Sequence, residues 1–233
     1  LIGEDLLDPY GGAFKVSKGL STSYPDQVIS TPISEAGIVG SAVGMAMRGL
    51  KPIVEIMFGD FITLVVDQIV NHASKYSWMY NEKLTVPVLI RTPVGGRRGY
   101  GPTHSQSLES MFMSIPGIDI VAPSLCHNPG KMLENLINRI ERPTIFVEYK
   151  TDYAKTLYGN QIENFYLTRD YNEHNQNILL TMYPDEQPDT IVITYGGNTS
   201  IAIEAAKKTF MDNEVLTNIL VLSSVRPIDK EWV

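Results

Sequence analysis

Short runs of apolar and β-branched residues recur along the chain, and proline, glycine or polar residues bound each of them. They occupy residues 52–58, 86–91, 118–121, 144–148, 190–194 and 218–222. Runs of this length are typical of buried β-strands. The stretches between them leave room for helices, so the pattern alternates strand with helix. Such alternation predicts an α/β fold with a mostly parallel sheet and helices on both of its faces.

The stretch after the first of these runs has a helical period. Phe61, Val65 and Ile69 recur at steps of four residues, while Asp67 and Asn71 fall on another face. This spacing predicts an amphipathic helix that places one apolar stripe against the sheet.

Two domains are expected from the way the pattern changes along the chain. Residues 1–150 keep the alternation, whereas residues 151–188 are rich in tyrosine, asparagine and acidic residues, which predicts a linker. A new β-α-β unit follows over residues 189–233, with only two strands. Because two parallel strands and one helix cannot close a core, we expect this unit to be the start of a larger α/β domain.

Composition narrows the class of protein without identifying a function. The 233 residues are 43% hydrophobic and 19% charged, as in folded proteins. The single cysteine excludes an intrachain disulfide and favours a reducing compartment, the bacterial cytoplasm or the mitochondrial matrix. A net charge of −7 disfavours nucleic acid as a partner. The longest uncharged apolar stretch, residues 36–47, falls short of the ~20 residues that a membrane helix needs.

The first segment with recognisable chemistry is residues 30–37, STPISEAG. Pro32 favours an extended residue before it, and Ser34 suits a helix N-cap, so Glu35 is expected in the first turn. On position alone, the favourable interaction of an acid with the helix dipole explains Glu35 better than catalysis does. The helix that follows is rich in glycine and alanine, which indicates that something packs very close to it.

A glycine-rich segment, residues 92–106, follows one predicted strand. Open α/β sheets bind ligands at such positions, although neither common nucleotide fingerprint fits these residues. His104 lies in this loop and could be an acid, a base, an anion donor or simply a polar surface group.

Metal and serine-hydrolase chemistry find little support. The four histidines lack metal-ligand spacing, and Cys126 and His127 are adjacent in sequence, so they cannot easily bind one ion. Ser105 follows His104 without the turn that surrounds a nucleophilic serine. We therefore expect no metal ligands in this chain.

Four segments together carry a resemblance to a known family: TPISEAGIVGSAVGMAMRGLKPIVEIMFGDF, VVDQIVNHASKY, PVLIRTPVGG and YGPTHSQSLE. They resemble the beta subunit of the thiamin-diphosphate-dependent decarboxylase component of 2-oxo acid dehydrogenase complexes. The resemblance covers residues 1–150 in order and resumes at DTIVITYGG. It implies a transketolase-like pyrimidine-binding domain over residues 1–150 and part of that family's C-terminal domain over residues 189–233.

The resemblance also implies roles for four residues. Glu35 would hydrogen-bond a ring nitrogen of the cofactor's aminopyrimidine and so activate the cofactor, and Ile33 would line the pyrimidine pocket. Phe61 would stack on the ring. His104 would face the reacting end, where it could steady the intermediate or assist acyl transfer to a lipoyl group.

The same resemblance implies partners. The family's diphosphate and magnesium site uses a GDG motif, which does not occur in this chain. We therefore expect an alpha subunit to bind Mg²⁺ and the diphosphate, with thiamin diphosphate at the interface of an α2β2 assembly. A lipoyl-bearing acyltransferase component and a small 2-oxo acid would be the other partners.

One segment departs from the family. Many members have an Ala-Ile-Arg-Asp-x-Asn-Pro-like segment that binds a structural potassium ion. Residues 137–143 of this chain, INRIERP, lose its Asp and Asn ligands, which makes that ion doubtful. Arg142 would put a fixed positive charge in its place.

Two alternatives remain beside oxidative decarboxylation of a 2-oxo acid with lipoyl acylation. One is a related thiamin-dependent carboligase or acyl-transferring subunit that uses the same Glu35 chemistry. The other is a non-catalytic assembly subunit, against which the presence of Glu35, Phe61 and His104 together argues.

Overall fold

The computed structural model describes residues 1–159, 161, 162, 164–171 and 176–228. Within these ranges the chain divides into two compact units. The first comprises Leu1–Ile120 with Asn135–Val147, and the second comprises Val121–Glu134 with the described residues from Glu148 onward.

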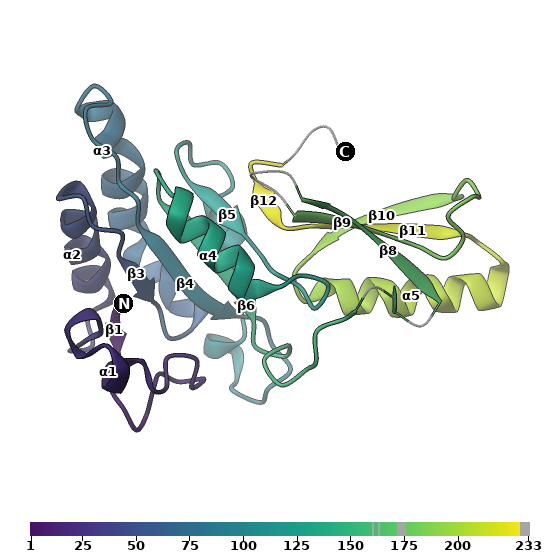
Figure 1. Cartoon of the computed structure of the whole chain (residues 1–233), viewed down its shortest axis with the longest axis horizontal. Helices are drawn as coiled ribbons and strands as arrows, with labels where there is room; N and C mark the ends of the chain where they lie inside the picture. The colour runs from purple at the N-terminus through teal and green to yellow at the C-terminus, as the bar shows by residue number, and fades with distance from the viewer. Residues whose placement is uncertain (160, 163, 172–175, 229–233) are drawn as a thin grey trace. The chain divides into compact units, whose positions relative to one another are not determined.

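The first unit is built on a sheet of short strands (Figure 1). They are β1 (Ile2–Glu4), β2 (Ile29–Thr31), β3 (Ile53–Glu55), β4 (Leu89–Val94), β5 (Asp119–Val121) and β6 (Thr144–Tyr149). These six follow the order β5-β6-β4-β3-β1-β2. The pairs β1–β2, β1–β3 and β3–β4 are parallel, and every residue of β4 is buried. The predicted α/β fold with a mostly parallel sheet is therefore confirmed.

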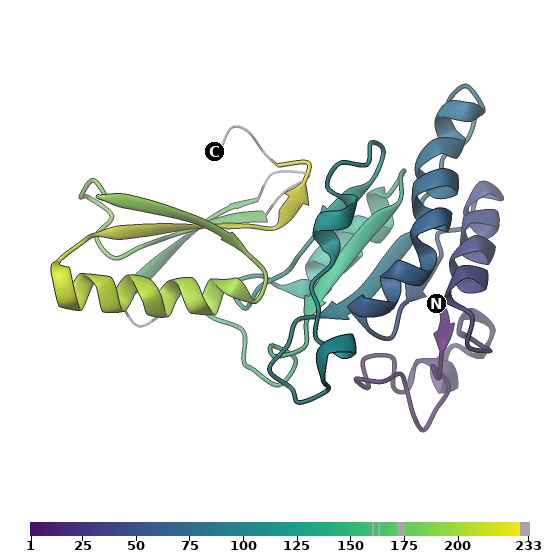
Figure 2. The same cartoon turned by 180° about the vertical axis from the view of Figure 1, so that it is seen from behind.

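Helical segments occupy most of the predicted connections. They are α1 (Leu20–Ser23), α2 (Glu35–Met47), a 3₁₀ segment (Gly59–Val65), a π-helical segment (Gln68–Ala73), α3 (Ser74–Met79) and α4 (Pro129–Arg139). Shorter 3₁₀ turns lie at Pro25–Gln27, Pro102–His104 and Glu109–Phe112. α2 and α3 lie side by side in both views (Figures 1 and 2). None of the helices in the described ranges combines the length and the apolar character that crossing a bilayer requires.

The helix predicted from Phe61 onward is not a regular α-helix. It passes from 3₁₀ to π to α geometry between Gly59 and Met79. Val65 and Ile69 are nevertheless buried, as the apolar stripe requires. Periodicity therefore identified the buried face, but it did not reveal the changes of helical type. Such changes are often associated with functional sites.

The second unit contains a five-stranded sheet and one long helix. Its strands are β7 (Gln161–Ile162), β8 (Phe165–Tyr171), β9 (Gln176–Thr181), β10 (Thr190–Tyr195) and β11 (Thr217–Leu222), in the order β10-β11-β9-β8-β7. β10 and β11 are parallel, and the other pairs are antiparallel. Helix α5 (Asn198–Asn213) contacts β10 and β11, and a short strand, β12 (Ser224–Arg226), follows β11.

The reading of residues 151–188 as a linker is wrong for the part that the structure describes. β8 and β9 lie in this tract and pair with each other, and β9 pairs with β11. Phe165, Ile178 and Leu180 from these strands are fully buried in the core of the second unit. The polar residues around them concealed two strands whose apolar side chains complete the core that β10, β11 and α5 could not close alone.

Candidate functional site

Glu35 is the first residue of α2, as predicted, and its side chain is only 8% exposed. Ser34 occupies the N-cap position, and its carbonyl accepts the first hydrogen bond of the helix from the Ile38 N–H at 2.9 Å, but its side chain makes no capping hydrogen bond. The unpaired N–H groups of a first turn favour a negative charge. The Glu35 carboxylate therefore lies where the helix dipole favours an acid.

A second carboxylate, which sequence reasoning missed, lies close to the first. Glu4 ends β1 and is buried, and its Oε1 atom has no hydrogen-bond partner in the described part of the chain. Burial raises the pKa of Glu4, and the negative charge of Glu35 raises it further. The only sequence signal was an acid directly after the apolar start of the chain, Leu1-Ile2-Gly3.

Ile33 lies two residues before α2 and is 82% exposed. The preceding Pro32 and the strand β2, which ends at Thr31, hold this segment at the edge of the sheet. An isoleucine so exposed beside a buried carboxylate offers an apolar contact to a ligand or a partner chain.

Phe61 and His104 are brought together by a cluster of rings. The ring centroids of Phe61 and His104 are 5.2 Å apart, and both rings meet Phe58 edge-on, at 5.7 and 4.7 Å. Tyr100 and Phe14 contact the same Phe58 ring at 5.6 and 5.4 Å. We call these five side chains the aromatic cluster. Phe58, Phe14 and Tyr100 were not among the predicted site residues.

The loop that carries His104 is fixed to the segment that carries Phe61. Asp60 is buried and accepts a hydrogen bond from the Gln106 side-chain amide at 2.7 Å, and the Gln106 N–H lies 3.3 Å from the same oxygen. The Gln106 carbonyl in turn accepts from the Gly95 N–H at 3.1 Å. These bonds close the loop at its base and hold His104 beside Phe61.

The two halves of the predicted site are connected through α2. Glu35 and Ile33 lie at its start, and α2 packs against the 3₁₀ segment Gly59–Val65 that carries Phe61. The site thus has a carboxylate end and an aromatic end on elements of one unit.

The close packing predicted around the small residues of α2 is only partly provided by the chain itself. Ala42 and Ala46 are buried against the unit, but Gly44 is exposed, and a Cβ built on it would meet nothing within 4 Å. At the end of α3, Trp78 is 77% exposed, with Met79 and Tyr80 beside it also exposed. Both helices therefore present surfaces suited to another polypeptide.

A buried ion pair links the neighbouring strands β3 and β4. Arg91 on β4 donates to Glu55 on β3 at 2.5 Å, and both side chains are buried. Glu55 also lies close to the N-terminal loop, because a Cβ on Gly12 would come within 2.6 Å of its Oε1 atom. A side chain at position 12 would be strained by the φ of +78° and would displace the Glu55 carboxylate.

The carbonyl groups at the end of α4 are bound by a lysine. Lys51 Nζ donates to the carbonyl oxygens of Ile137 and Asn138, each at 2.9 Å. Arg142, predicted to place its charge here, instead has its Nε atom 3.8 Å from Asp119. The positive charge that binds these carbonyl groups is therefore that of Lys51, beside Arg139 in the last turn of α4.

His127 is a structural residue of the second unit. Its side chain is buried; Nδ1 accepts from the Ser124 N–H at 3.0 Å, and Nε2 lies 2.8 Å from the Gln176 carbonyl oxygen. Burial lowers the pKa of His127 to about 4, and burial also raises the pKa of the neighbouring Cys126 thiol to about 11. In the described ranges no three His, Cys, Asp or Glu side chains gather as a metal site.

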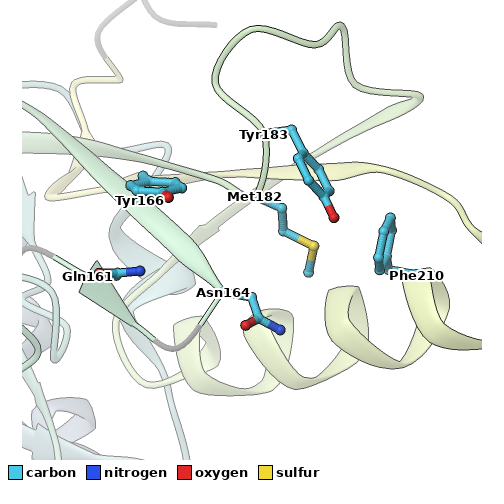
Figure 3. Close-up of a pocket in the computed structure, with 6 residues that line it drawn as sticks. All are labelled: Gln161, Asn164, Tyr166, Met182, Tyr183 and Phe210. Atoms are coloured by element: carbon cyan, nitrogen blue, oxygen red, sulfur yellow. The ribbon is translucent and has the colours of Figure 1, made fainter.

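A separate hollow of about 240 Å³ opens in the second unit (Figure 3). It is lined by Gln161, Asn164, Tyr166, Met182, Tyr183 and Phe210. Tyr183 and Phe210 stand 5.8 Å apart between ring centroids. None of these residues carries a charge at neutral pH or belongs to the predicted site, so the catalytic candidates remain those of the first unit.

Comparison with protein families matches residues 1–156 to the family described as "Transketolase, pyrimidine binding domain". Among curated proteins, the chain is 34% identical to the acetoin:2,6-dichlorophenolindophenol oxidoreductase subunit beta of Cupriavidus necator, over the whole chain and 68% of that protein. It is 33% identical to the 2-oxoisovalerate dehydrogenase subunit beta of Bacillus subtilis, again over the whole chain and 68% of that protein. With the mitochondrial pyruvate dehydrogenase E1 component subunit beta-1 of Arabidopsis thaliana, the identity is 32% over 62% of that protein.

Solved structures support the same fold. A structure titled "Split gene transketolase, inactive beta4 tetramer" superimposes with a TM-score of 0.68 over 99% of this chain and 67% of that one, at 18% identity. A transketolase from Pichia stipitis gives a TM-score of 0.70 over 99% of this chain and 33% of that one, at 14% identity. At these identities the likeness concerns the fold alone. The chain spans about three fifths to two thirds of the curated relatives it matches.

Proposed function

Because the chain belongs to the transketolase pyrimidine-binding-domain family, we propose that it is the beta subunit of a thiamin-diphosphate-dependent 2-oxo acid dehydrogenase. The relatives named as beta subunits of pyruvate and 2-oxoisovalerate dehydrogenases support this proposal. The observation that carries it is the buried Glu35 carboxylate at the start of α2, with the exposed Ile33 two residues before it.

The residues at this end of α2 suit the aminopyrimidine of the cofactor. Glu35 would accept a hydrogen bond from a ring nitrogen, and Ile33 would contact the ring's apolar face. The pKa of Glu4 is raised by burial and by the nearby Glu35 charge, so Glu4 keeps a proton to higher pH than an ordinary glutamate. Orphaned Oε1 of Glu4 is available to hold a proton beside Glu35.

The aromatic cluster would form the other side of the cofactor site. When bound, thiamin diphosphate supplies the nucleophile and the electron sink for decarboxylation of a 2-oxo acid. Phe61 would stack against the cofactor ring. His104, which Phe58 and Phe61 hold edge-on, would donate or accept a hydrogen bond at the reacting end. Its Nδ1 atom lies 3.1 Å from Thr103 Oγ1, which orients the imidazole.

The proposed assembly is an α2β2 heterotetramer in which an alpha subunit binds Mg²⁺ and the diphosphate. The exposed Gly44 on α2 and the exposed Trp78 on α3 support burial against other subunits. A lipoyl-bearing acyltransferase component would accept the acyl group. The relatives include bacterial and mitochondrial proteins, and we propose the cytoplasm or the mitochondrial matrix as its location.

Potassium does not fit the place that the family resemblance suggests. The carbonyl oxygens of Ile137 and Asn138 already accept hydrogen bonds from Lys51, whose ammonium carries the charge of a monovalent cation. Ile140 and Arg142 stand where the family pattern has its Asp and Asn ligands. We propose that this chain does without the ion.

The second candidate function is a related thiamin-dependent enzyme that does not use a lipoyl acceptor, because one relative is named for acetoin and a dye acceptor. An assay of lipoyl-domain acylation separates the two. A dehydrogenase of the proposed type acylates the lipoyl group when a 2-oxo acid is supplied, whereas a carboligating enzyme consumes the 2-oxo acid and leaves the lipoyl group free.

Replacement of Glu35 tests the proposal directly. In the complex co-purified with its alpha subunit, Glu35→Gln should lower kcat by about 10²–10⁴-fold, since it removes the carboxylate that activates the cofactor. Glu134→Gln, on the exposed side of α4, is the matched control and should leave kcat unchanged. Unchanged turnover of Glu35→Gln would instead favour the non-catalytic assembly subunit.

Calorimetry tests the shared site. The isolated chain should give no saturable binding of thiamin diphosphate in excess Mg²⁺, and the complex with the alpha subunit should give a saturable isotherm. A tight one-to-one isotherm from the isolated chain would contradict a cofactor site shared between subunits.

A further inference from the structure

The loop between Gly95 and Gln106 carries two adjacent arginines, Arg97 and Arg98, in a chain whose net charge is −7. Arg97 is exposed, and in the described part of the chain its side chain makes no hydrogen bond or ion pair. Its backbone has φ +64°, a conformation that costs a non-glycine residue roughly 1 kcal/mol. An exposed guanidinium is thus presented to solvent on the loop that also carries His104.

This loop is anchored at both ends of its exposed part. Its base is closed by the hydrogen bond from the Gly95 N–H to the Gln106 carbonyl. Further along, Tyr100 packs edge-on against Phe58, and His104 packs edge-on against the same ring. Tyr100 and His104 therefore flank one phenylalanine, and the part of the loop that precedes Tyr100 is held near the aromatic end of the site.

The reach of Arg97 follows from this anchoring. Its neighbour Gly96 lies against Ser105, because a Cβ on Gly96 would come 3.6 Å from the Ser105 Cβ, and Ser105 directly follows His104. A long side chain starting at Arg97 can meet the far end of a small molecule whose reacting carbon lies beside His104. Guanidinium groups bind carboxylates and phosphates through two parallel hydrogen bonds, which makes them selective for such groups.

We propose that Arg97 selects a 2-oxo acid that carries a second anionic group at the end remote from its oxo group. This inference rests on the proposed function, because it assumes that a 2-oxo acid reacts beside His104. A substrate with a neutral tail would leave the Arg97 guanidinium without a partner. A substrate with a carboxylate or phosphate tail would pair with it.

The experiment compares 2-oxoglutarate with 2-oxovalerate, which have equal chain lengths and differ in the charge of the tail. Turnover by the complex with the alpha subunit is followed with an artificial dye acceptor, so that no acceptor protein takes part. We expect at least a tenfold higher kcat/KM for 2-oxoglutarate. Arg97→Gln should abolish this preference by raising KM for 2-oxoglutarate, with kcat/KM for 2-oxovalerate unchanged, and Arg97→Lys should restore it in part. A substrate with a phosphonate tail shows which anion is preferred.

Arg98→Gln is the matched control, because it removes the same charge from the same loop. The preference of this variant for 2-oxoglutarate over 2-oxovalerate should stay within about threefold of the wild-type preference. An equal loss in both variants, or a wild-type enzyme that does not prefer 2-oxoglutarate or the phosphonate, would overturn the role of Arg97. A parallel assay of the same variants replaces the dye by a lipoyl-domain acceptor. If Arg97→Gln raised only the KM for that acceptor, the loop would recognise a protein and the proposal would be wrong.

If the proposed dehydrogenase function itself is wrong, the assay gives a different result. A complex that turns over no 2-oxo acid at all refutes the dehydrogenase assignment together with this inference. A complex that decarboxylates 2-oxovalerate as well as 2-oxoglutarate retains the assignment and refutes only the selective role of Arg97.

Discussion

Acidification from pH 7 to pH 5 is expected to lower the free energy of unfolding through one buried side chain, His127. Its ring is only 3% exposed. Nε2 lies 2.8 Å from the Gln176 carbonyl oxygen and must carry the proton of the neutral ring, while Nδ1 accepts from the Ser124 N–H. A second proton would have to go on Nδ1, where it would face that donor.

The sign follows from the two pKa values. Burial lowers the pKa of His127 from 6.5 to about 4, so the unfolded chain binds a proton that the folded chain does not. Stability is therefore complete above pH 6.5 and falls as the pH drops toward 4. The difference between the two pKa values corresponds to at most roughly 3 kcal/mol, of which about 2 kcal/mol is lost between pH 7 and pH 5.

Urea denaturation at a series of pH values measures this loss. The wild-type chain is compared with His127→Gln, which cannot titrate, and with His72→Gln, which removes a partly exposed histidine. Between pH 7 and pH 5, wild type and His72→Gln should lose about 2 kcal/mol more than His127→Gln. Equal losses in all three proteins would show that His127 does not remain neutral in the folded state and would refute the reasoning.

Two further predictions concern charged side chains of the first unit. Arg91→Met leaves the buried Glu55 carboxylate without its guanidinium and should lower the free energy of unfolding, measured by urea denaturation, by about 3–5 kcal/mol. Adding Glu55→Gln should recover part of that loss, and a double variant no more stable than Arg91→Met alone would contradict the pairing. Lys51→Met removes the charge from the Ile137 and Asn138 carbonyls and should cost about 0.3–1 kcal/mol, since the lysine is exposed. Wild-type melting temperatures should be equal in KCl and NaCl, and stabilisation by K⁺ alone would indicate a potassium site.

The sequence was sufficient for the elements whose signal is local. Six apolar runs became β3, β4, β5, β6, β10 and β11, because a buried strand needs little more than a short run of β-branched residues with breaks at its ends. Glu35 at the start of α2 was equally predictable, since Pro32 and Ser34 mark a helix start whatever packs around it. The family, too, was recognisable from the order of four motifs.

Strands with mixed composition were not predictable in the same way. β8 and β9 lie within a polar tract, and only pairing with each other and with β11 makes strands of them. Phe165 and Leu180 are apolar, but more polar than apolar residues lie between and around them. β-structure depends on neighbours far along the chain, so a window of sequence does not contain the information.

What the sequence by itself determined was the class of fold, the position of Glu35 and the family. Only the tertiary structure decided which side chains come near one another: Glu4 and Glu35, Tyr100 and His104 around the Phe58 ring, and Lys51 at the end of α4. The physical reason is one of range. Periodicity records which face of an element is buried, whereas a shifted pKa, an edge-on ring contact or a bound carbonyl group arises between residues that many intervening positions separate, and only packing of the whole unit brings them together.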